Sequence, residues 1–459
     1  MTRRSSAWLA WASLALAAAA LAGGLWWLAP SAPVAVPSTL ADGLVPTDAA
    51  TIERGRYLAT VGNCQHCHTA RGGPTFAGGR ALHTPFGVVF SSNLTPSATG
   101  LANWTAADFW RALHHGQSRD GRWLSPAFPF GNTTHIARAD SDAIHAYLRT
   151  LPPVDKAVPP HELAWPFNTQ AALKVWRALY FTPGAADPAA VPDATVPNAQ
   201  AAAPEVLRGA YLVRGLGHCS ACHAPRDALG GSRQPLALSG WRLPGQNWYA
   251  PSLTAPAEAG LQDWSATDVV ALFQAGRAGQ AVVTGPMAEV VQHSTQHWHL
   301  DDLQALAAYL RQLPRTPPTE APGAPRAPDP GPAPTTTTGN TAFAAALGAR
   351  LYKQHCAQCH GDEGEGRPLA SGRPGYTALA GNRAVLLASP VNLVQQVMNG
   401  GYAPATAGHP RPLGMPPFVL ALSDADMAAV LTHIRTQWGN RASPVSALDV
   451  QTLRGGPRH

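Results

Sequence analysis

Every cysteine of the chain lies in one of three copies of a single pattern, in which two residues separate a pair of cysteines and a histidine follows directly. The copies are Cys64-x-x-Cys67-His68, Cys219-x-x-Cys222-His223 and Cys356-x-x-Cys359-His360. This spacing is typical of covalent attachment of c-type haem. Two thiols one helical turn apart can each bond a vinyl group of the same porphyrin, and the histidine then becomes an axial ligand of the iron. The sequence therefore predicts three covalently bound haems c and no free thiol.

Other roles for these cysteines fit parts of the pattern. A Cys-x-x-Cys pair can supply half of a zinc site or act as a redox dithiol of the thioredoxin type. Six cysteines in an exported chain could instead form three disulfides. None of these roles accounts for a histidine directly after the second cysteine of every copy, so haem attachment is the stronger interpretation.

Methionine is scarce but well placed to complete two of the haem sites. An electron-carrying haem iron normally takes a second axial ligand from its opposite face, and methionine there raises the potential relative to a second histidine. Met287 and Met415 lie in expected loops just before the last predicted helix of their domains. Met398 and Met427 fall within helical patterns and are expected to be core residues. We therefore expect Met287 to bind the second iron and Met415 the third.

The first haem has no such ligand, because no methionine occurs over residues 51–182. The equivalent loop carries Phe128, whose ring cannot bind iron. His135 is the preferred sixth ligand because it follows that loop and precedes a predicted helix. The alternatives are His114 or His115, or an open or water-bound iron.

The N-terminus predicts export. Arg3 and Arg4 precede an uncharged apolar stretch over residues 7–29. At about 1.5 Å per residue, this stretch is long enough to cross a hydrocarbon core of about 30 Å. We expect residues 1–30 to be an uncleaved membrane anchor with its arginines in the cytoplasm. The alternative is a signal peptide that is removed near Ala29. Either way, the rest of the chain lies on the periplasmic side of the bacterial cytoplasmic membrane.

Segments rich in proline and alanine divide the remainder into three domains with one haem motif each. The second linker is also rich in threonine and is expected to be an extended spacer. The expected parts are domains at 47–182, 205–314 and 342–440, linkers at 183–204 and 315–341, and a tail at 441–459.

The domains are expected to be repeats of one mainly α-helical unit. A helical segment with a small residue near an aromatic one precedes each motif, as in Glu53–Tyr57 and Leu207–Tyr211. Two domains then share a Trp-Thr/Ser-Ala-x-Asp run, which predicts a helix with Thr105 or Ser265 as its N-cap. Apolar residues at three- and four-residue spacing predict closing helices over 140–151, 300–313 and 423–438. Strand-like alternation is nearly absent.

Charge excludes one class of partner. The net charge is +6, with arginine greatly outnumbering lysine, and no basic run is dense enough to suggest nucleic acid. We interpret the excess as a mildly basic solvated surface, with no nucleic-acid partner.

From about Ile52 to Asn440, the chain resembles the tri-haem cytochrome c subunits of membrane-bound bacterial dehydrogenases. The resemblance implies three tandem class I cytochrome c-like domains after an N-terminal membrane anchor. In that family the first-domain loop often reads Pro-Ala-Met-Pro, so Phe128 departs from the family's ligation of the first iron. The segments that carry the resemblance are Thr84–Pro96, Arg119–Arg122, Pro126–Pro129, Gly285–Met287 and Trp438–Asn440.

The resemblance also implies partners. In that family a separate catalytic dehydrogenase subunit, of quinoprotein, flavin or molybdenum type, supplies electrons that pass to ubiquinone or a terminal oxidase. The Phe128 version looks more like members paired with molybdenum enzymes. No nucleophile, general base or substrate pocket is visible in the sequence, so we expect an electron-transfer subunit without turnover of its own. The alternative function is a haem-based peroxidase or gas-binding protein that uses an open first haem.

Overall fold

The computed structural model describes residues 32–36, 47–185, 202–234, 237–243, 245–279, 281–317, 338–369 and 375–454. Across those ranges, no helix combines the length and the apolar character that a membrane crossing needs. The anchor predicted at 1–30 lies outside them, as do most of the two predicted linkers.

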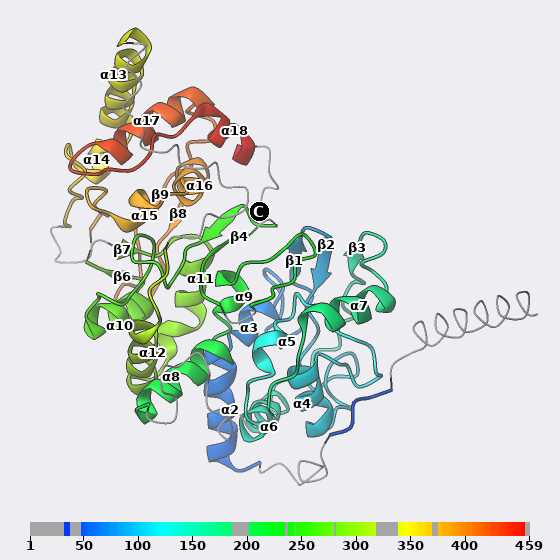
Figure 1. Ribbon diagram of the computed structural model, residues 1–459. Coiled ribbons are helices and arrows are strands. Elements are labelled where there is room, and N and C mark those ends of the chain that lie inside the picture. The colour runs from blue at the N-terminus through cyan, green and yellow to red at the C-terminus, as the bar shows by residue number, and fades with distance from the viewer. Residues whose placement is uncertain are drawn as a thin grey trace, which may run out of the picture.

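Three pairs of packed helices organise the structure (Figure 1). In each pair, the helix before a Cys-x-x-Cys-His motif packs against the predicted closing helix, so the three closing helices are confirmed. The pairs are α2 (Ala49–Val61) with α6 (Arg138–Leu148), α8 (Pro204–Arg214) with α12 (Leu300–Gln312), and α13 (Thr338–His355) with α17 (Asp424–Thr436). We call the parts of the chain around these pairs the first repeat (47–185), the second repeat (202–317) and the third repeat (338–454).

Each helix pair meets at a glycine. A Cβ atom on Gly55 of α2 would collide with the carbonyl oxygen of Ala143 in α6. Gly209 and Gly348 meet the closing helices of their own repeats in the same way. The small residue that precedes each motif in the sequence is therefore required by the close approach of two helix backbones.

The predicted N-caps are confirmed. Helix α4 (Ala106–His115) begins after Thr105, whose hydroxyl accepts a hydrogen bond from the backbone N–H of Asp108 at 3.1 Å. Helix α10 (Ala266–Ala275) begins after Ser265, which accepts one from the N–H of Asp268 at 3.0 Å. These bonds satisfy N–H groups that have no partner within the first helical turn.

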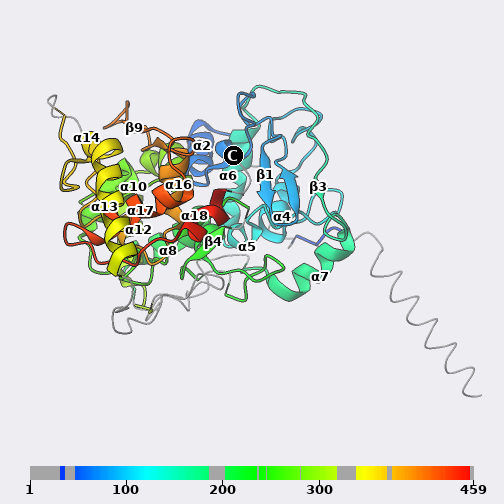
Figure 2. The ribbon, with the colours of Figure 1, turned by 90° about the horizontal axis from the view of Figure 1, so that it is seen from above.

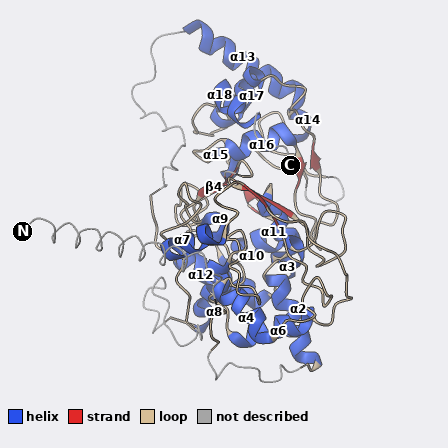
Figure 3. Cartoon of the chain, turned by 90° about the vertical axis from the view of Figure 1, so that its right-hand side faces the viewer, coloured by secondary structure: helices blue, strands red, loops and turns tan. Residues whose placement is uncertain are grey.

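Short antiparallel strands accompany the helices, and the sequence did not predict them. The first repeat has a sheet in the order β1 (Ala81–Thr84), β2 (Gly87–Phe90) and β3 (Glu162–Leu163), with Ala81 opposite Phe90. Each strand of the described residues spans only two to four residues, too few for alternation to show in the sequence. Figure 3 shows the strands among the helices. The remaining pairs are β4 (Trp241–Leu243) with β5 (Trp248–Ala250), β6 (Arg277–Ala278) with β7 (Ala281–Val282), and β8 (Gly401–Tyr402) with β9 (Gly414–Met415).

Two further helices follow closing helices. Helix α7 (Gln170–Tyr180) lies in the first repeat, within the predicted first domain. Helix α18 (Ala447–Arg454) lies in the segment expected to be a tail. Val450 and Leu453 of α18 are buried in the core of the third repeat, so this part of the chain belongs to that repeat.

The first and second repeats share one hydrophobic core, whereas the third has its own. The shared core joins residues such as Leu58 and Ile144 of the first repeat to Leu212 and Leu306 of the second. The third repeat docks on the second, where the Asn392 amide donates to the carbonyl oxygen of Tyr249 at 2.7 Å. Figure 1 shows the second repeat between the other two.

The contact between the first two repeats is reciprocal. The Asn132 amide of the first repeat donates to the carbonyl oxygen of Arg214, near the end of α8, at 2.8 Å. In return, the Ser294 hydroxyl of the second repeat donates to the carbonyl oxygen of Val61, at the end of α2, at 2.9 Å. Each repeat therefore donates a hydrogen bond to the end of the helix that precedes the other repeat's Cys-x-x-Cys-His motif.

Candidate haem sites

The cysteine motifs lie on single-turn helices directly after the opening helices. These turns are α3 (Cys64–Cys67), α9 (Ser220–His223) and α14 (Ala357–His360). All six cysteines are free of disulfides, and burial raises the pKa of Cys64 and Cys219 to about 12. The structure therefore presents six thiols in three pairs, each pair about one turn apart, as attachment to one porphyrin requires.

The histidine of each motif is oriented by a backbone carbonyl. The Nδ1 atoms of His68, His223 and His360 each lie 2.7 Å from a carbonyl oxygen, those of Ser92, Pro251 and Thr377 respectively. A carbonyl only accepts, so Nδ1–H donates and the lone pair of Nε2 is available to a metal. Burial lowers the pKa of all three imidazoles, which favours the neutral form that binds iron.

The sequence analysis did not identify these carbonyl groups, although a signal for two of them was present. Ser92 and Pro251 directly precede the related segments Asn93-Leu-Thr and Ser252-Leu-Thr. The same loop bond recurs after each motif: the backbone N–H groups of Gly78, Gly240 and Gly366 donate to the carbonyl oxygens of the three histidines at 2.7–2.8 Å. In the first two repeats, the related tripeptides therefore directly follow the residue whose carbonyl group contacts the motif histidine.

Met287 lies in the first turn of α11 (Pro286–His293) rather than in the expected loop, and it packs against the shared core. Met415 also departs from the expected loop, because it lies in β9, and it packs against the core of the third repeat with its sulfur 3.9 Å from the Gln396 amide. Met398, in α16 (Val391–Asn399), and Met427 are 3% and 0% exposed. Their expected role as core residues is confirmed.

Phe128 occupies the position of the first repeat that Met287 occupies in the second. The N–H of Leu124 donates to the carbonyl oxygen of Gly116 at 2.8 Å, and the N–H of Val283 donates to that of Gly276 at 2.9 Å. Both glycines end equivalent helices. Phe128 follows Leu124 by four positions, and Met287 follows Val283 by four positions.

The histidines considered for the first iron gather on one side of the first repeat. His135 follows α5 (Phe130–Thr133), and its ring lies beside Gly184. Burial, with a contribution from Arg214, lowers the pKa of His135 to about 4. The rings of His114 and His115 are 4.7 Å apart, and His114 stacks on Trp110. Burial also lowers the pKa of His114 to about 4, so these imidazoles are neutral near pH 7.

Paired thiols on a single helical turn, followed by a histidine oriented through Nδ1, are the attachment apparatus of a c-type cytochrome. Residues 345–438 match the family model described as cytochrome c.

Known proteins match far more of the chain. It is 37% identical over 419 residues to the "Alcohol dehydrogenase (quinone), cytochrome c subunit" of Gluconacetobacter polyoxogenes, covering 89% of this chain and 85% of that protein. It is 35% identical over 424 residues to the "Gluconate 2-dehydrogenase cytochrome c subunit" of Pantoea cypripedii, covering 88% and 90%. The chain therefore belongs to the family of cytochrome c subunits of dehydrogenases, which transfer electrons.

A shorter relative matches only part of the chain. A "Diheme cytochrome c-type" protein of Cereibacter sphaeroides is 35% identical over 310 residues, which are 66% of this chain and 97% of that protein. None of these relatives supports the alternative of a peroxidase or gas-binding protein.

Proposed function

We propose that each repeat is a cytochrome c domain holding one covalently attached haem c, so that the chain carries three. The observation that carries this proposal is the 2.7 Å contact between motif histidine and backbone carbonyl, which occurs three times. The proposed domains are 47–182, 205–314 and 342–454, the last extended beyond residue 440 because α18 packs into the core of the third repeat. The cysteine pairs Cys64/Cys67, Cys219/Cys222 and Cys356/Cys359 would form the thioether bonds, and His68, His223 and His360 would be the proximal iron ligands.

A haem c held in this way exchanges one electron at a time at its iron. The protein's contribution is to fix and tune each site. Ser92, Pro251 and Thr377 hold the rings of the motif histidines in one tautomer and one orientation. Met287 and Met415 are the proposed sixth ligands in the second and third repeats, where a thioether favours the ferrous state.

For the first repeat, His135 remains the proposed sixth ligand. Phe128 stands at the position equivalent to Met287 and has no atom that can bind iron. The competing proposals are His114 or His115, or an iron that is open or water-bound. A neutral imidazole is the form that binds iron, and burial favours that form in both His135 and His114.

The proposed path begins at a catalytic dehydrogenase subunit and ends at ubiquinone or a terminal oxidase. Membership of a family of dehydrogenase subunits supports the first partner. A quinoprotein, flavin or molybdenum enzyme would fit. We place the chain on the periplasmic side of the cytoplasmic membrane, held by an anchor at residues 1–30, because these residues include a spanning length of apolar sequence.

The test is reduction of the chain with and without its partner. A candidate catalytic dehydrogenase subunit from the same organism is purified and mixed with the haem-loaded chain, and candidate substrates are added while the ferrous absorption band is followed. We expect reduction only when both substrate and catalytic subunit are present, and reoxidation when a ubiquinone analogue is added. Substrate oxidation or peroxide turnover by the isolated chain would contradict the proposal.

A further inference from the structure

Helix α7 turns an apolar face away from the protein. Val175 and Leu179 are 48% and 59% exposed, and they lie four residues apart on one side of the helix. Ala178, also exposed, completes this face, and Lys174 lies at its edge, one turn before Ala178. In the segment just before α7, Trp165 is 81% exposed. We call Val175, Ala178 and Leu179 the α7 apolar surface.

Contacts on the opposite side of α7 fix the rotation of the helix about its axis. These contacts therefore determine that the apolar face points away from the protein. The Arg177 guanidinium lies 3.9 Å from the centre of the Trp123 ring. The Trp176 indole N–H donates to the carbonyl oxygen of Leu229 at 3.1 Å, and the Tyr180 hydroxyl donates to Asp227 at 2.7 Å. An ordinary surface helix has the reverse arrangement, with its polar side chains outward.

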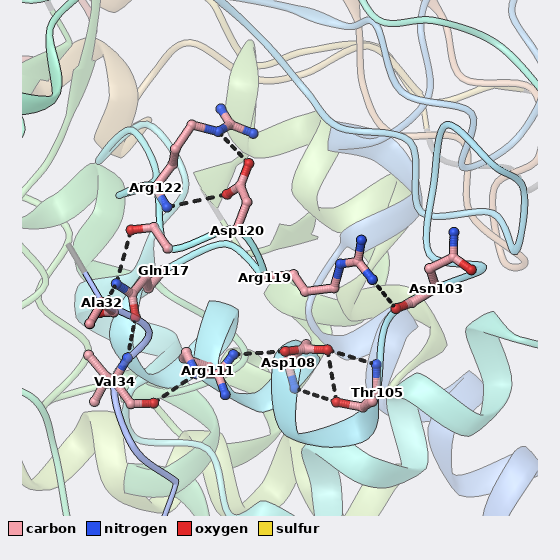
Figure 4. A network of polar contacts seen from close by, with 11 residues as sticks. Ala32, Val34, Asn103, Thr105, Asp108, Arg111, Gln117, Arg119, Asp120 and Arg122 are labelled. Atoms are coloured by element: carbon pink, nitrogen blue, oxygen red, sulfur yellow. Dashed lines mark hydrogen bonds and ion pairs between the residues drawn. The ribbon is translucent and has the colours of Figure 1, made fainter. Parts of the chain in front are cut away.

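The α7 apolar surface lies on the side of the protein where the chain emerges from its apolar N-terminal stretch. The Gln117 amide donates to the carbonyl oxygen of Ala32 at 3.0 Å and accepts from the N–H of Val34 at 2.6 Å (Figure 4). Gln117 pairs with Trp123, whose N–H donates to Gln170, the first residue of α7, at 2.8 Å. Figures 1 and 2 both show residues 32–36 and α7 on the same side of the first repeat.

We propose that the α7 apolar surface inserts into the outer interface of the lipid bilayer. This inference rests on the proposed membrane anchor. Apolar residues 7–29 end three residues before Ala32, and an extended chain spans at most about 3.6 Å per residue. The bilayer surface therefore lies within roughly 11 Å of Ala32, which is held beside the hairpin that bonds to α7.

The chemistry of the neighbouring groups fits a lipid surface. Tryptophan is enriched at membrane interfaces, where its ring is apolar and its N–H can be hydrated. Arg119 and Arg122 lie in the turn between Gln117 and Trp123, where the Arg122 side chain is 67% exposed and pairs with Asp120 at 2.7 Å. They can approach anionic headgroups while Val175 and Leu179 enter the region roughly 5–10 Å below them. The first repeat would then face lipid, and the third repeat, at the opposite end in Figures 1 and 2, would be farthest from it.

The test uses the full haem-loaded chain in vesicles that contain anionic lipid. One variant, Leu179→Cys, carries a fluorophore on the added cysteine. The matched control is Leu420→Cys, because Leu420 of the third repeat is 98% exposed. Emission is compared between vesicles with and without doxyl-labelled lipid, so that constant quenching by the haems cancels in the ratio. Flotation of the vesicles reports whether the chain is bound.

We expect the chain to float with the vesicles and the label at position 179, but not that at 420, to lose emission in doxyl-labelled lipid. Quenching by iodide, which stays in the aqueous phase, measures the exposure of each label to water. If the chain floats and iodide quenches both labels equally, this inference alone is overturned. A chain that fails to float overturns the anchor proposal as well. Shielding of position 179 only after the catalytic subunit is added would make the surface a protein interface, which also overturns the inference.

Discussion

The hydroxyl of Tyr57 in α2 donates a 2.6 Å hydrogen bond to Asp302 in α12, across the boundary between the first and second repeats. The reverse bond joins Tyr211 of α8 to Asp140 of α6, also at 2.6 Å. Each carboxylate is held in its own repeat by an arginine, and Arg208 contacts Asp302 at 2.8 Å. The first two repeats are therefore joined by equivalent bonds in both directions.

Replacing Tyr57 with phenylalanine should weaken this boundary. A hydrogen bond to a charged group contributes about 1.5–3 kcal/mol, and we expect a loss of that order in the free energy of unfolding of the first two repeats. Denaturant unfolding measures it. Tyr402→Phe is the control, because Tyr402 is 71% exposed in the third repeat. Equal stability of the two variants would contradict the assigned role of the bond.

The same variant should alter the response to acid. Burial alone would raise the pKa of Asp302, but hydrogen bonds from Arg208 and Tyr57 outweigh it and hold this pKa below its usual value. A carboxyl with a lowered pKa stabilises the fold above its unfolded pKa, and this contribution is lost as the pH falls through the folded pKa. Without Tyr57, the loss should begin at higher pH.

Replacement of Met287 or Met415 with alanine should remove the thioether-to-iron charge-transfer absorption of one haem and lower its potential, because the proposed ligand is lost. All three haems should stay attached. Met427→Leu is the control, since a buried methionine of the third repeat tolerates a change that conserves volume. An unchanged absorption in the doubly substituted protein would place the sixth ligands elsewhere.

Replacement of Gly348 with alanine should destabilise the third repeat by about 1–3 kcal/mol, the usual cost of overpacking a close contact. The added Cβ would collide with the carbonyl oxygen of Ala429. Gly408→Ala is a control within the same repeat, because nothing lies within 4 Å of the added atom. Denaturant unfolding, followed through the absorption of the third haem, compares the stability of the two variants. If both variants have the wild-type midpoint, the helix contact is not as close as described.

The first haem should have the lowest potential of the three, because a second imidazole favours the ferric state relative to methionine. His135→Ala should then convert one low-spin haem to a high-spin species in the ferric EPR spectrum. His297→Ala is the matched control, because His297 is the equivalent of His135 in the second repeat. Two residues after each histidine, the N–H group of Ala137 or His299 donates to a tyrosine hydroxyl at 3.1 Å. An unchanged spectrum of the His135 variant would reject this ligand, and a high-spin haem in the unmodified protein would favour an open site.

The elements that the sequence predicted best are those with local causes. Thr105 and Ser265 cap helices through side chains three residues from the groups they bind, and the closing helices show their apolar spacing directly. The same holds for the position of Phe128, because its loop keeps the length of the loop that carries Met287.

Other features depend on partners far away in the chain. Ser92 reaches His68 only after the intervening loop closes, and a backbone carbonyl has no residue type to identify it. Helix α18 lies in the segment expected to be a tail, yet Val450 is fully buried in the core of the third repeat, whose other members lie far away in the chain. Met287 was expected in a loop just before the closing helix, but Pro286 fits the first turn of a helix and begins α11 there.

The central claim is that the chain carries three haems c, one for each repeat. The most direct measurement is the ratio of haem to protein in the purified chain, from a pyridine haemochrome assay and quantitative amino-acid analysis, with intact-mass determination after denaturation. The account predicts three haems that remain attached when the protein unfolds, and two when Cys219 and Cys222 are both replaced with alanine. A ratio of two or one in the unmodified protein would contradict it.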